Sequence, residues 1–426
     1  MKNFTFPAFV LSGFGYVATS ALIVSFSLAA TEASALDESK AVVDQNPVVV
    51  NTTKVEGGFK PEYLEKIVLP KGFSISVFAD DVPGARSMAL SDEGVLYVGT
   101  RGRRSSPKRL GSIYAVVDEN SDFKADQVIE LASDLFMPNG VAVRNGSLYV
   151  AEPNRVLRYD DIDNSLNKAP EPVVLNDSYP SDIHHGWKYI GFGPDDRLYL
   201  PVGAPCNICE ADEQYSVITS IDASGKDKRV VARGVRNTVG FDWHPETKEL
   251  WFTDNGRDLW SDTMPPEELN RVSQEGEHFG FPYEYGKGHR DNVFTVPSEK
   301  FTHAALELPA HTAPLGMKFY TGEMFPSTYK NNILIPHHGS WNKSEPAGYY
   351  ISFVELEGNS PKQHTLFASG WLQDDGYWGR PTDLLQLPDG SLLVSDDHAG
   401  VIYRISYRAE QDHAKQDKAE QSRGKQ

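Results

Sequence analysis

The sequence predicts an all-β fold, a six-bladed β-propeller, because one strand–turn–strand unit recurs six times. Most units have an apolar run, a turn with Asp-Gly, Asn-Gly or Pro-Asp steps, and a second β-rich run. Such turns supply the positive φ values or tight bends that hairpins need. The second runs recur roughly every 50 residues with one longer gap, a period typical of propeller blades. A β-sandwich does not repeat its sequence at this period.

The six units follow one another within residues 60–407, which we interpret as a single propeller domain. They occupy residues 88–98, 141–150, 192–200, 241–252, 317–335 (a distorted copy) and 385–394. Five are followed by a further β-rich run, at residues 112–116, 155–159, 217–221, 349–353 and 401–405. We expect residues 73–78 to add a strand to the last blade and close the ring. The long gap at residues 257–312 predicts inserted loops rather than blade, either on a face that binds ligands or as simple surface elaboration.

The composition excludes several partners and kinds of site. The 426 residues carry 59 acids against 41 bases, a formal net charge of −18. This excess of acids argues against nucleic acid or an anionic membrane surface as the main partner. Two cysteines in so long a chain exclude a disulfide-dense scaffold and any four-cysteine zinc or iron–sulfur site.

The two ends of the chain differ from the repeats. An uncharged, mostly apolar run over residues 4–30 ends at Ala33-Ser34-Ala35, so residues 1–35 are predicted to be a secretory signal peptide. The alternative is an uncleaved membrane anchor. Cleavage would give a periplasmic or secreted protein without stable membrane insertion. Residues 36–59 are interpreted as a linker, and the polar residues 408–426 as a disordered tail.

Two segments near the third and fourth units carry groups suited to catalysis and anion binding. His185, in Ile183-His-His-Gly-Trp187, is a candidate general base, because the ordinary pKa of histidine lies near neutral pH. A purely structural histidine is the alternative. Arg236 and Asn237 offer a donor fork and an amide to a carboxylate-bearing ligand. The alternative is an ordinary solvated loop, in which the same residues would have no ligand.

Three further segments hold polar groups of possible function. Gly256 with Glu267 could supply oxygen ligands for calcium, or could belong to an acidic surface turn. His337 and His338 point to opposite faces of a strand, so a ligand-facing loop is more consistent with them than a metal site. Arg380 opens the sixth unit at the equivalent place.

The two cysteines stand as Cys206-Asn-Ile-Cys209. Covalent haem attachment needs a histidine after the second cysteine, where Glu210 stands instead. A thioredoxin-like pair belongs on a βαβ unit, which the pattern lacks. In an exported protein we therefore expect a local disulfide.

Taken together, these motifs resemble the glucose/sorbosone dehydrogenase family, soluble quinoproteins that use pyrroloquinoline quinone (PQQ) and calcium. The resemblance covers residues 60–407 and is carried in order by six motifs. They are His-Gly-Trp…Gly-Pro-Asp (185–195), Gly-Val-Arg-Asn…Trp-His-Pro (234–245), Glu-Glu-Leu-Asn (267–270), Ala-Pro-Leu-Gly…Phe-Tyr-Thr-Gly (313–322), His-Gly-Ser-Trp-Asn (338–342) and Gly-Arg-Pro-Thr-Asp (379–383). The stretch Gly-Ala-Pro-Cys-Asn-Ile-Cys looks most like the sorbosone-type branch.

The resemblance implies a role for each matching residue. His185 would take the hydroxyl proton of a sugar while a hydride passes to the quinone, and an external acceptor would then receive the electrons. The implied cofactor contacts are Arg236, Asn237, Asn255 and Arg380, with Lys343 and Asn139 as looser matches. Calcium would bind the backbone oxygens of Gly256 and Arg257 and the carboxylate of Glu267.

Three positions depart from the family pattern. Ala204 stands where sugar-oxidising members carry an aspartate that orients the histidine, and we expect Asp182 to take its place. Thr382 replaces a second arginine, and Arg257 replaces a proline beside the calcium site. Two other functions remain open on the sequence alone: a calcium-dependent lactonase-type hydrolase and a non-catalytic binding propeller.

Overall fold

The computed structural model describes residues 59–103, 109–290 and 292–409. The predicted signal peptide, nearly all of the linker and all but two residues of the tail lie outside these ranges. Within them, the helices are three short 3-10 segments, and none could cross a membrane. They are η1 (Pro61–Lys66), η2 (Asp163–Ser165) and η3 (Ser327–Tyr329).

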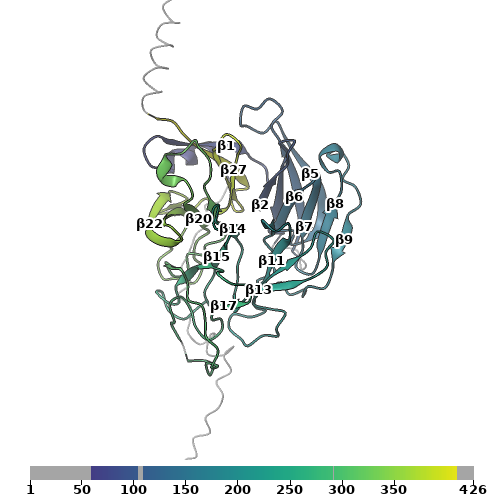
Figure 1. Ribbon diagram of the computed structural model, residues 1–426. Helices are drawn as coiled ribbons and strands as arrows, with labels where there is room; N and C mark the ends of the chain where they lie inside the picture. Colours follow the sequence, from purple (N-terminus) through teal and green to yellow (C-terminus); the bar gives the residue numbers. More distant parts are fainter. Residues whose placement is uncertain (1–58, 104–108, 291, 410–426) are drawn as a thin grey trace, which may run out of the picture. The chain divides into compact units, whose positions relative to one another are not determined.

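Six sheets of four or five strands confirm the predicted six-bladed propeller (Figure 1). The first three blades are β2 (Ala85–Leu90), β3 (Leu96–Thr100), β4 (Leu110–Val117), β5 (Gln127–Phe136); β6 (Gly140–Arg144), β7 (Ser147–Ala151), β8 (Val156–Tyr159), β9 (Val173–Asn176); and β10 (Gly191–Phe192), β11 (Leu198–Val202), β12 (Val217–Ile221), β13 (Arg229–Arg233), β17 (Glu277–His278). The last three are β14 (Phe241–Trp243), β15 (Leu250–Asp254), β16 (Glu267–Arg271), β18 (Leu306–Leu308); β19 (Lys318–Phe319), β20 (Ile333–His337), β21 (Tyr350–Glu357), β22 (Ser360–Ala368); and β25 (Pro381–Gln386), β26 (Leu392–Asp396), β27 (Val401–Tyr407), β1 (Phe73–Ala79). A small hairpin, β23 (Leu372–Gln373) with β24 (Gly376–Tyr377), precedes the last blade.

β1, the first strand among the described residues, closes the ring, as predicted. β1 pairs antiparallel with β27, with Phe73 opposite Tyr407, and Figure 1 shows the two side by side. Glycine allows the innermost strands to approach one another closely: a Cβ on Gly240 would lie 2.1 Å from the carbonyl oxygen of Leu315 in the next blade. A larger residue there would push the fourth and fifth blades apart.

The apolar core lies between neighbouring blades, because successive side chains of a strand point to opposite faces of its sheet. In β3, Leu96 and Val98 pack on the cluster shared with the sixth blade, whereas Tyr97 packs on the cluster shared with the second. All three side chains are fully buried. Burying such a side chain contributes on the order of 1.5–3 kcal/mol. Both faces are covered, which explains why these strands are apolar throughout.

The segment 257–312 corrects one sequence prediction. It was expected to form loops, yet it contains β16 and β18, the third and fourth strands of the fourth blade. β16 begins with Glu267 and Glu268, which are both buried. Buried carboxylates interrupt the apolar pattern by which strands are normally identified, so the sequence pattern did not indicate a blade strand here.

Candidate active site

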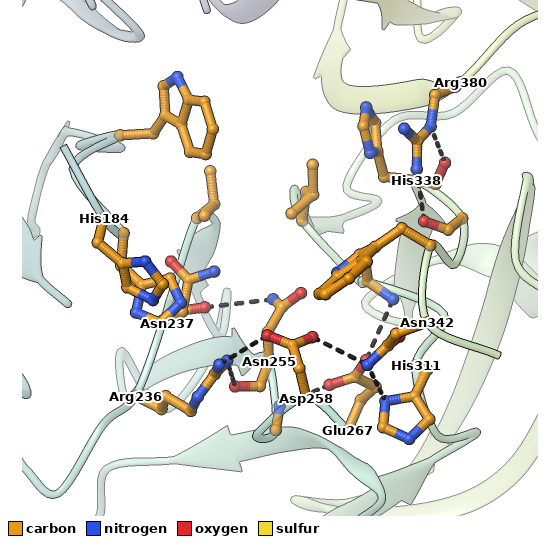
Figure 2. Close-up of a pocket in the computed structure, with 18 of the residues that line it drawn as sticks. His184, Arg236, Asn237, Asn255, Asp258, Glu267, His311, His338, Asn342 and Arg380 are labelled. Carbon is orange, nitrogen blue, oxygen red and sulfur yellow. Dashed lines mark hydrogen bonds and ion pairs between the residues drawn. The ribbon is translucent and has the colours of Figure 1, made fainter. Parts of the chain in front are cut away.

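A cavity of about 440 Å³ lies where innermost strands begin and second strands end. Arg86 and Arg380 come from the starts of β2 and β25, and Asn255 and His338 follow the ends of β15 and β20. Figure 2 shows His184 and Arg236 on one side of this cavity and His338 and Arg380 on the other. The lining also includes Arg109, Trp187, Asp258, His311, Trp341 and Asn342.

Most of the predicted site residues meet in this cavity. Its lining includes His185, Arg236, Asn237, Asn255, Gly256, Glu267 and Arg380. Four predicted residues are not part of the lining: Asp182, Asn139, Arg257 and Lys343. The Lys343 ammonium donates to the carbonyl of Asp262 at 2.8 Å, and the Asn139 amide donates to the carbonyl of Lys188 at 2.7 Å.

His185 is held in one tautomer by the backbone of the neighbouring strand end. Its Nδ1 lies 2.8 Å from the carbonyl oxygen of Ala204. A carbonyl can only accept, so Nδ1 carries the proton and the neutral ring keeps a lone pair on Nε2. Gly203 makes the contact possible, since a Cβ there would lie 2.6 Å from Cβ of His185.

The electrostatic surroundings keep His185 uncharged at neutral pH. Desolvation lowers its pKa well below the ordinary value, and the nearby Arg236 and His184 lower it further. The hydrogen bond to Ala204 acts in the opposite direction but does not offset these effects. A neutral imidazole with a free Nε2 is the form that a general base requires.

Asp182 was expected to orient His185, but the carboxylate of Asp182 bonds to a different residue. The Asp182 carboxylate accepts a 2.6 Å hydrogen bond from the hydroxyl of Tyr215 and is exposed. The backbone carbonyl of Ala204 occupies the place at Nδ1 instead. A backbone group can do this at any residue type, which is why the side chain of Ala204 gave no sign of it.

Arg236 is a buried cation with a dense set of partners. Its Nε and Nη2 donate to the carbonyl and the amide oxygen of Asn207, both at 2.8 Å. Nη2 also lies 3.0 Å from Asp258, and Nη1 donates to the carbonyl of Asn255 at 3.1 Å (Figure 2). The backbone N–H groups of Arg236 and Asn237 both donate to the Asp254 carboxylate. The guanidinium is therefore fixed in direction at the cavity wall.

Arg380 carries its charge without a carboxylate partner among the described residues. Its guanidinium donates to the carbonyls of His338 and Gly339 and lies over the rings of Tyr349 and Tyr377, 5.3 and 5.2 Å from their centroids. A guanidinium so held still has hydrogen-bond donors and a positive charge for an anionic ligand.

Two acidic residues, Glu267 and Asp258, also line the cavity. Glu267 is buried and accepts backbone N–H groups from Gly256 at 2.6 Å and Ala313 at 3.2 Å. Burial raises the pKa of Glu267 to about 8, and the nearby Asp258 raises it too. Asp258 accepts from Asn342 at 3.1 Å, and Asn342 also contacts His311 (Figure 2).

A third carboxylate, Asp397, supports the opposite wall. Its side chain is fully buried, and its oxygens lie 2.8 Å from Arg86 Nε, 3.5 Å from Arg101 Nη1 and 2.8 Å from His338 Nε2. Arg86 in turn lies over the ring of Trp187, 5.0 Å from its centroid. Asp397 thus fixes two residues that line the cavity.

Several lining residues were missed by the sequence reasoning. Arg86 starts β2 just as Arg380 stands at the start of β25, so aligning the six repeats would have indicated it. Arg109, Asp258 and His311 lie in connections between strands, where no periodicity reports the direction of a side chain.

Among the described residues, no three or more His, Cys, Asp or Glu side chains are grouped so that they could hold a metal ion. A calcium site built partly from backbone carbonyls, as expected around Gly256, Arg257 and Glu267, is a different arrangement.

The raised pKa of Glu267 leads to a prediction about the protein without ligands. A carboxyl group that binds its proton more tightly when folded stabilises the fold below its unfolded pKa, near 4.3. That contribution is lost as the pH rises through about 8. We expect Glu267→Gln to lose less stability between pH 5 and pH 9 than the wild type does, as measured by thermal unfolding. Equal losses in the two proteins would contradict the assignment.

The Cys206–Cys209 pair forms the expected local disulfide. It closes a loop that follows β11, two residues beyond Ala204. This loop therefore continues directly from the carbonyl that holds His185.

Solved structures with the same fold include a pyranose dehydrogenase PQQ domain and a PQQ-bound aldose sugar dehydrogenase. The holo PQQ domain of pyranose dehydrogenase from Coprinopsis cinerea has a TM-score of 0.67 at 19% identity and covers 82% of this chain and 99% of that one. The PQQ-bound aldose sugar dehydrogenase from Streptomyces coelicolor has a TM-score of 0.56 at 18% identity, with coverages of 80% and 100%. At these identities the similarity establishes the fold.

Two curated proteins are similar in sequence. A PQQ-dependent pyranose dehydrogenase from Coprinopsis cinerea is 32% identical over 120 residues, which are 24% of this chain and 16% of that protein. An uncharacterized protein from Borreliella burgdorferi is 32% identical over 365 residues, covering 81% of this chain and 92% of its own length. The family model described as "Domain of unknown function (DUF7133)" matches residues 60–425. The chain therefore belongs to the DUF7133 family.

Proposed function

We propose that this protein oxidises a sugar, an aldose or a sorbosone-like compound, with PQQ as the hydride acceptor, calcium as the accompanying metal and His185 as the general base. The observation that carries the proposal is the neutral, single-tautomer His185 in a cavity that four arginines line. The PQQ-dependent sugar dehydrogenases that share the fold support it.

The residues of the cavity fit the proposed cofactor by their chemistry. PQQ is a planar ring system with three carboxylates and an ortho-quinone, so it needs cationic and amide donors around an open space. Arg236 and Arg380 would provide the cations, and Asn237 and Asn255 the amides. Lys343 and Asn139 are less suited, because neither of them lines the cavity.

The fit to calcium rests on Glu267. Each of its oxygens accepts one N–H and keeps a further lone pair, and a bound cation would favour the ionised form that burial disfavours. Calcium takes six to eight oxygen ligands. The backbone of Gly256 and Arg257, water and the cofactor would have to complete the shell.

Several residues of the site then have separate roles in the proposed oxidation. When bound, PQQ supplies a quinone that accepts hydride, and calcium polarises it as a Lewis acid. Nε2 of His185 takes the hydroxyl proton of the sugar, while the Ala204 carbonyl holds the ring in place through Nδ1. Arg236 and His184 disfavour the imidazolium, so the proton is readily released to water. The exposed Trp341 at the cavity offers an apolar face to a sugar ring.

Three further predictions made from the sequence belong to this proposal: the branch of the family, the location of the protein and its electron acceptor. We infer membership of the sorbosone-type branch of glucose/sorbosone dehydrogenases from the stretch Gly203-Ala-Pro-Cys-Asn-Ile-Cys209. The signal-peptide pattern of residues 1–35 supports a periplasmic or secreted location, with 1–35 as an uncleaved anchor in the alternative. The chain has no motif for covalent haem attachment, so we infer an external electron acceptor.

Arg380 provides a test of the cofactor contacts. Arg380→Lys keeps the charge but loses the planar fork that bonds two carbonyls and lies over two tyrosine rings. We expect the affinity for PQQ to fall about tenfold, as measured by titration in the presence of calcium. The matched change Arg404→Lys, outside the cavity, should leave the affinity unchanged.

Reconstitution tests the proposed function as a whole. The purified protein would be loaded with PQQ and Ca²⁺ and assayed for reduction of an artificial dye with a panel of aldoses and sorbosone-like aldehydes. We expect reduction that requires both the sugar and the cofactor. No cofactor-dependent reduction with any sugar, despite measurable PQQ binding, would favour a binding propeller instead.

A further inference from the structure

The disulfide between Cys206 and Cys209 encloses two residues with different partners. Ile208 is buried in an apolar cluster that includes Phe281. Asn207 instead reaches the wall of the cavity and bonds to two groups that line it. One residue of the ring therefore anchors the loop in the core, and the other contacts the site.

Asn207 makes four hydrogen bonds to site residues. Its backbone carbonyl accepts from Arg236 Nε and its Oδ1 accepts from Arg236 Nη2, both at 2.8 Å. The same Oδ1 accepts the backbone N–H of Asp258 at 2.8 Å, and Nδ2 donates to the Asp258 carbonyl at 3.2 Å. Asp258 in turn lies 3.0 Å from the guanidinium. Asn207 thus fixes both members of a partly buried ion pair.

The same loop also touches the proposed base. The N–H of Ala204 donates to the carbonyl of Arg236 at 2.8 Å, and the carbonyl of Ala204 holds Nδ1 of His185. Residues 203–207 therefore link His185, the proposed base, to Arg236. A disulfide that closes so short a loop constrains the whole unfolded chain less than one that closes a long loop. Its larger effect is then local, on the freedom of Asn207.

We propose that Asn207 is a positioning residue for Arg236 and Asp258, and that the Cys206–Cys209 disulfide holds it in place. The consequence for PQQ affinity rests on the proposed function, since it takes Arg236 as a cofactor contact. Without the Asn207 side chain, the guanidinium loses one acceptor and the Asp258 amide loses its partner. Arg236 then samples several directions, and an anionic ligand binds less tightly because binding must restore one of them.

Two readouts on matched variants test the positioning role. Asn207→Ala should speed hydrogen exchange of the Asp258 amide about tenfold or more and weaken PQQ binding about tenfold in the presence of calcium. Asn207→Asp retains the acceptor, so exchange of the Asp258 amide should stay within about threefold of the wild type, whereas the added negative charge beside Arg236 should weaken binding of the anionic cofactor. Asn164→Ala, an exposed asparagine outside the cavity, is the control and should change neither.

The disulfide is tested by coupling it to Asn207. A dithiol reductant transfers two electrons and two protons to the S–S bond, which yields two thiols while the reductant closes to its own disulfide. Reduction should weaken PQQ binding in the wild type but add little in Asn207→Ala, because both changes free the same contact. A Cys206→Ser/Cys209→Ser variant should behave like the reduced protein and excludes a direct effect of the reductant on PQQ.

The outcomes separate this inference from the proposed function. A wild-type protein that binds no PQQ would refute the proposed function, and exchange of the Asp258 amide would still decide the positioning role. Unchanged exchange in Asn207→Ala would overturn the inference. If the wild type binds PQQ, two other results would also overturn the inference. One is an unchanged PQQ affinity in Asn207→Ala. The other is a disulfide reduction that weakens PQQ binding as much in Asn207→Ala as in the wild type.

Discussion

Replacing His185 with alanine is expected to lower sugar oxidation by the PQQ-loaded protein by about 10²–10⁴-fold, the contribution that a positioned general base makes. The loss should appear in kcat, because the proton moves in the chemical step, and PQQ affinity should be unchanged. Since desolvation, Arg236 and His184 hold the pKa of His185 well below its ordinary value, the wild-type rate should not fall as the pH is lowered through about 6.5. Steady-state kinetics across pH measure both effects.

His303→Ala is the matched control for this change. The His303 side chain is about half exposed, and His303 is not among the residues that line the cavity. Its loss should leave the rate unchanged. The assignment of the base fails if His185→Ala oxidises sugar as fast as the wild type while retaining bound PQQ.

Asp397→Asn is expected to have the largest effect on stability, a loss of about 3–5 kcal/mol in the free energy of unfolding. The carboxylate is fully buried between Arg86, Arg101 and His338, so its removal leaves two guanidinium groups without their counter-charge. For a protein of this size, we expect a fall in the unfolding temperature of about 4–7 °C. Thermal unfolding followed by calorimetry measures it.

The pH dependence of this effect has a definite sign. Burial alone would raise the pKa of Asp397, but His338, Arg86 and Arg101 together hold it well below its ordinary value. A carboxylate of this kind stabilises the fold above its unfolded pKa, near 3.9, and the contribution is lost as the pH falls through the folded value. The difference between wild type and Asp397→Asn should therefore be constant above about pH 5 and shrink in acid.

Glu323→Gln provides the comparison for Asp397. Glu323 forms an ion pair with Lys330, but its side chain is 82% exposed, so water replaces the lost contact. Its unfolding temperature should stay within about 1 °C of the wild type. Similar losses in the two variants would show that the buried cluster around Asp397 does not have the role assigned to it.

The blade architecture could be predicted from the sequence because both faces of a propeller strand are covered. Leu96, Tyr97 and Val98 are apolar in succession for this reason, and equivalent runs recur in the second strand of the other blades. β16 was missed because it opens with two buried glutamates, Glu267 and Glu268, and binary patterning treats charged residues as exposed. Hydrophobic periodicity therefore found the scaffold but not the strand that carries a site residue.

The site was predictable where a side chain of a recognised motif lines the cavity, as with Arg236 and Arg380. It was not predictable where the backbone makes the contact. The carbonyl of Ala204 holds His185, and the residue type at a position does not indicate what its backbone carbonyl contacts. The same limit explains Lys343, whose ammonium bonds to the backbone carbonyls of Asp262 and Ala310 rather than lining the cavity.

A single-turnover experiment tests the central claim most directly. The protein loaded with PQQ and Ca²⁺ would be mixed with an aldose in the absence of any electron acceptor, and the absorbance of the oxidised quinone would be followed. We predict that the wild type reduces close to one equivalent of PQQ per site, and that His185→Ala reduces it at least about 100-fold more slowly. A wild type that binds PQQ but leaves it oxidised with every sugar would contradict the account, as would equal rates in the two proteins.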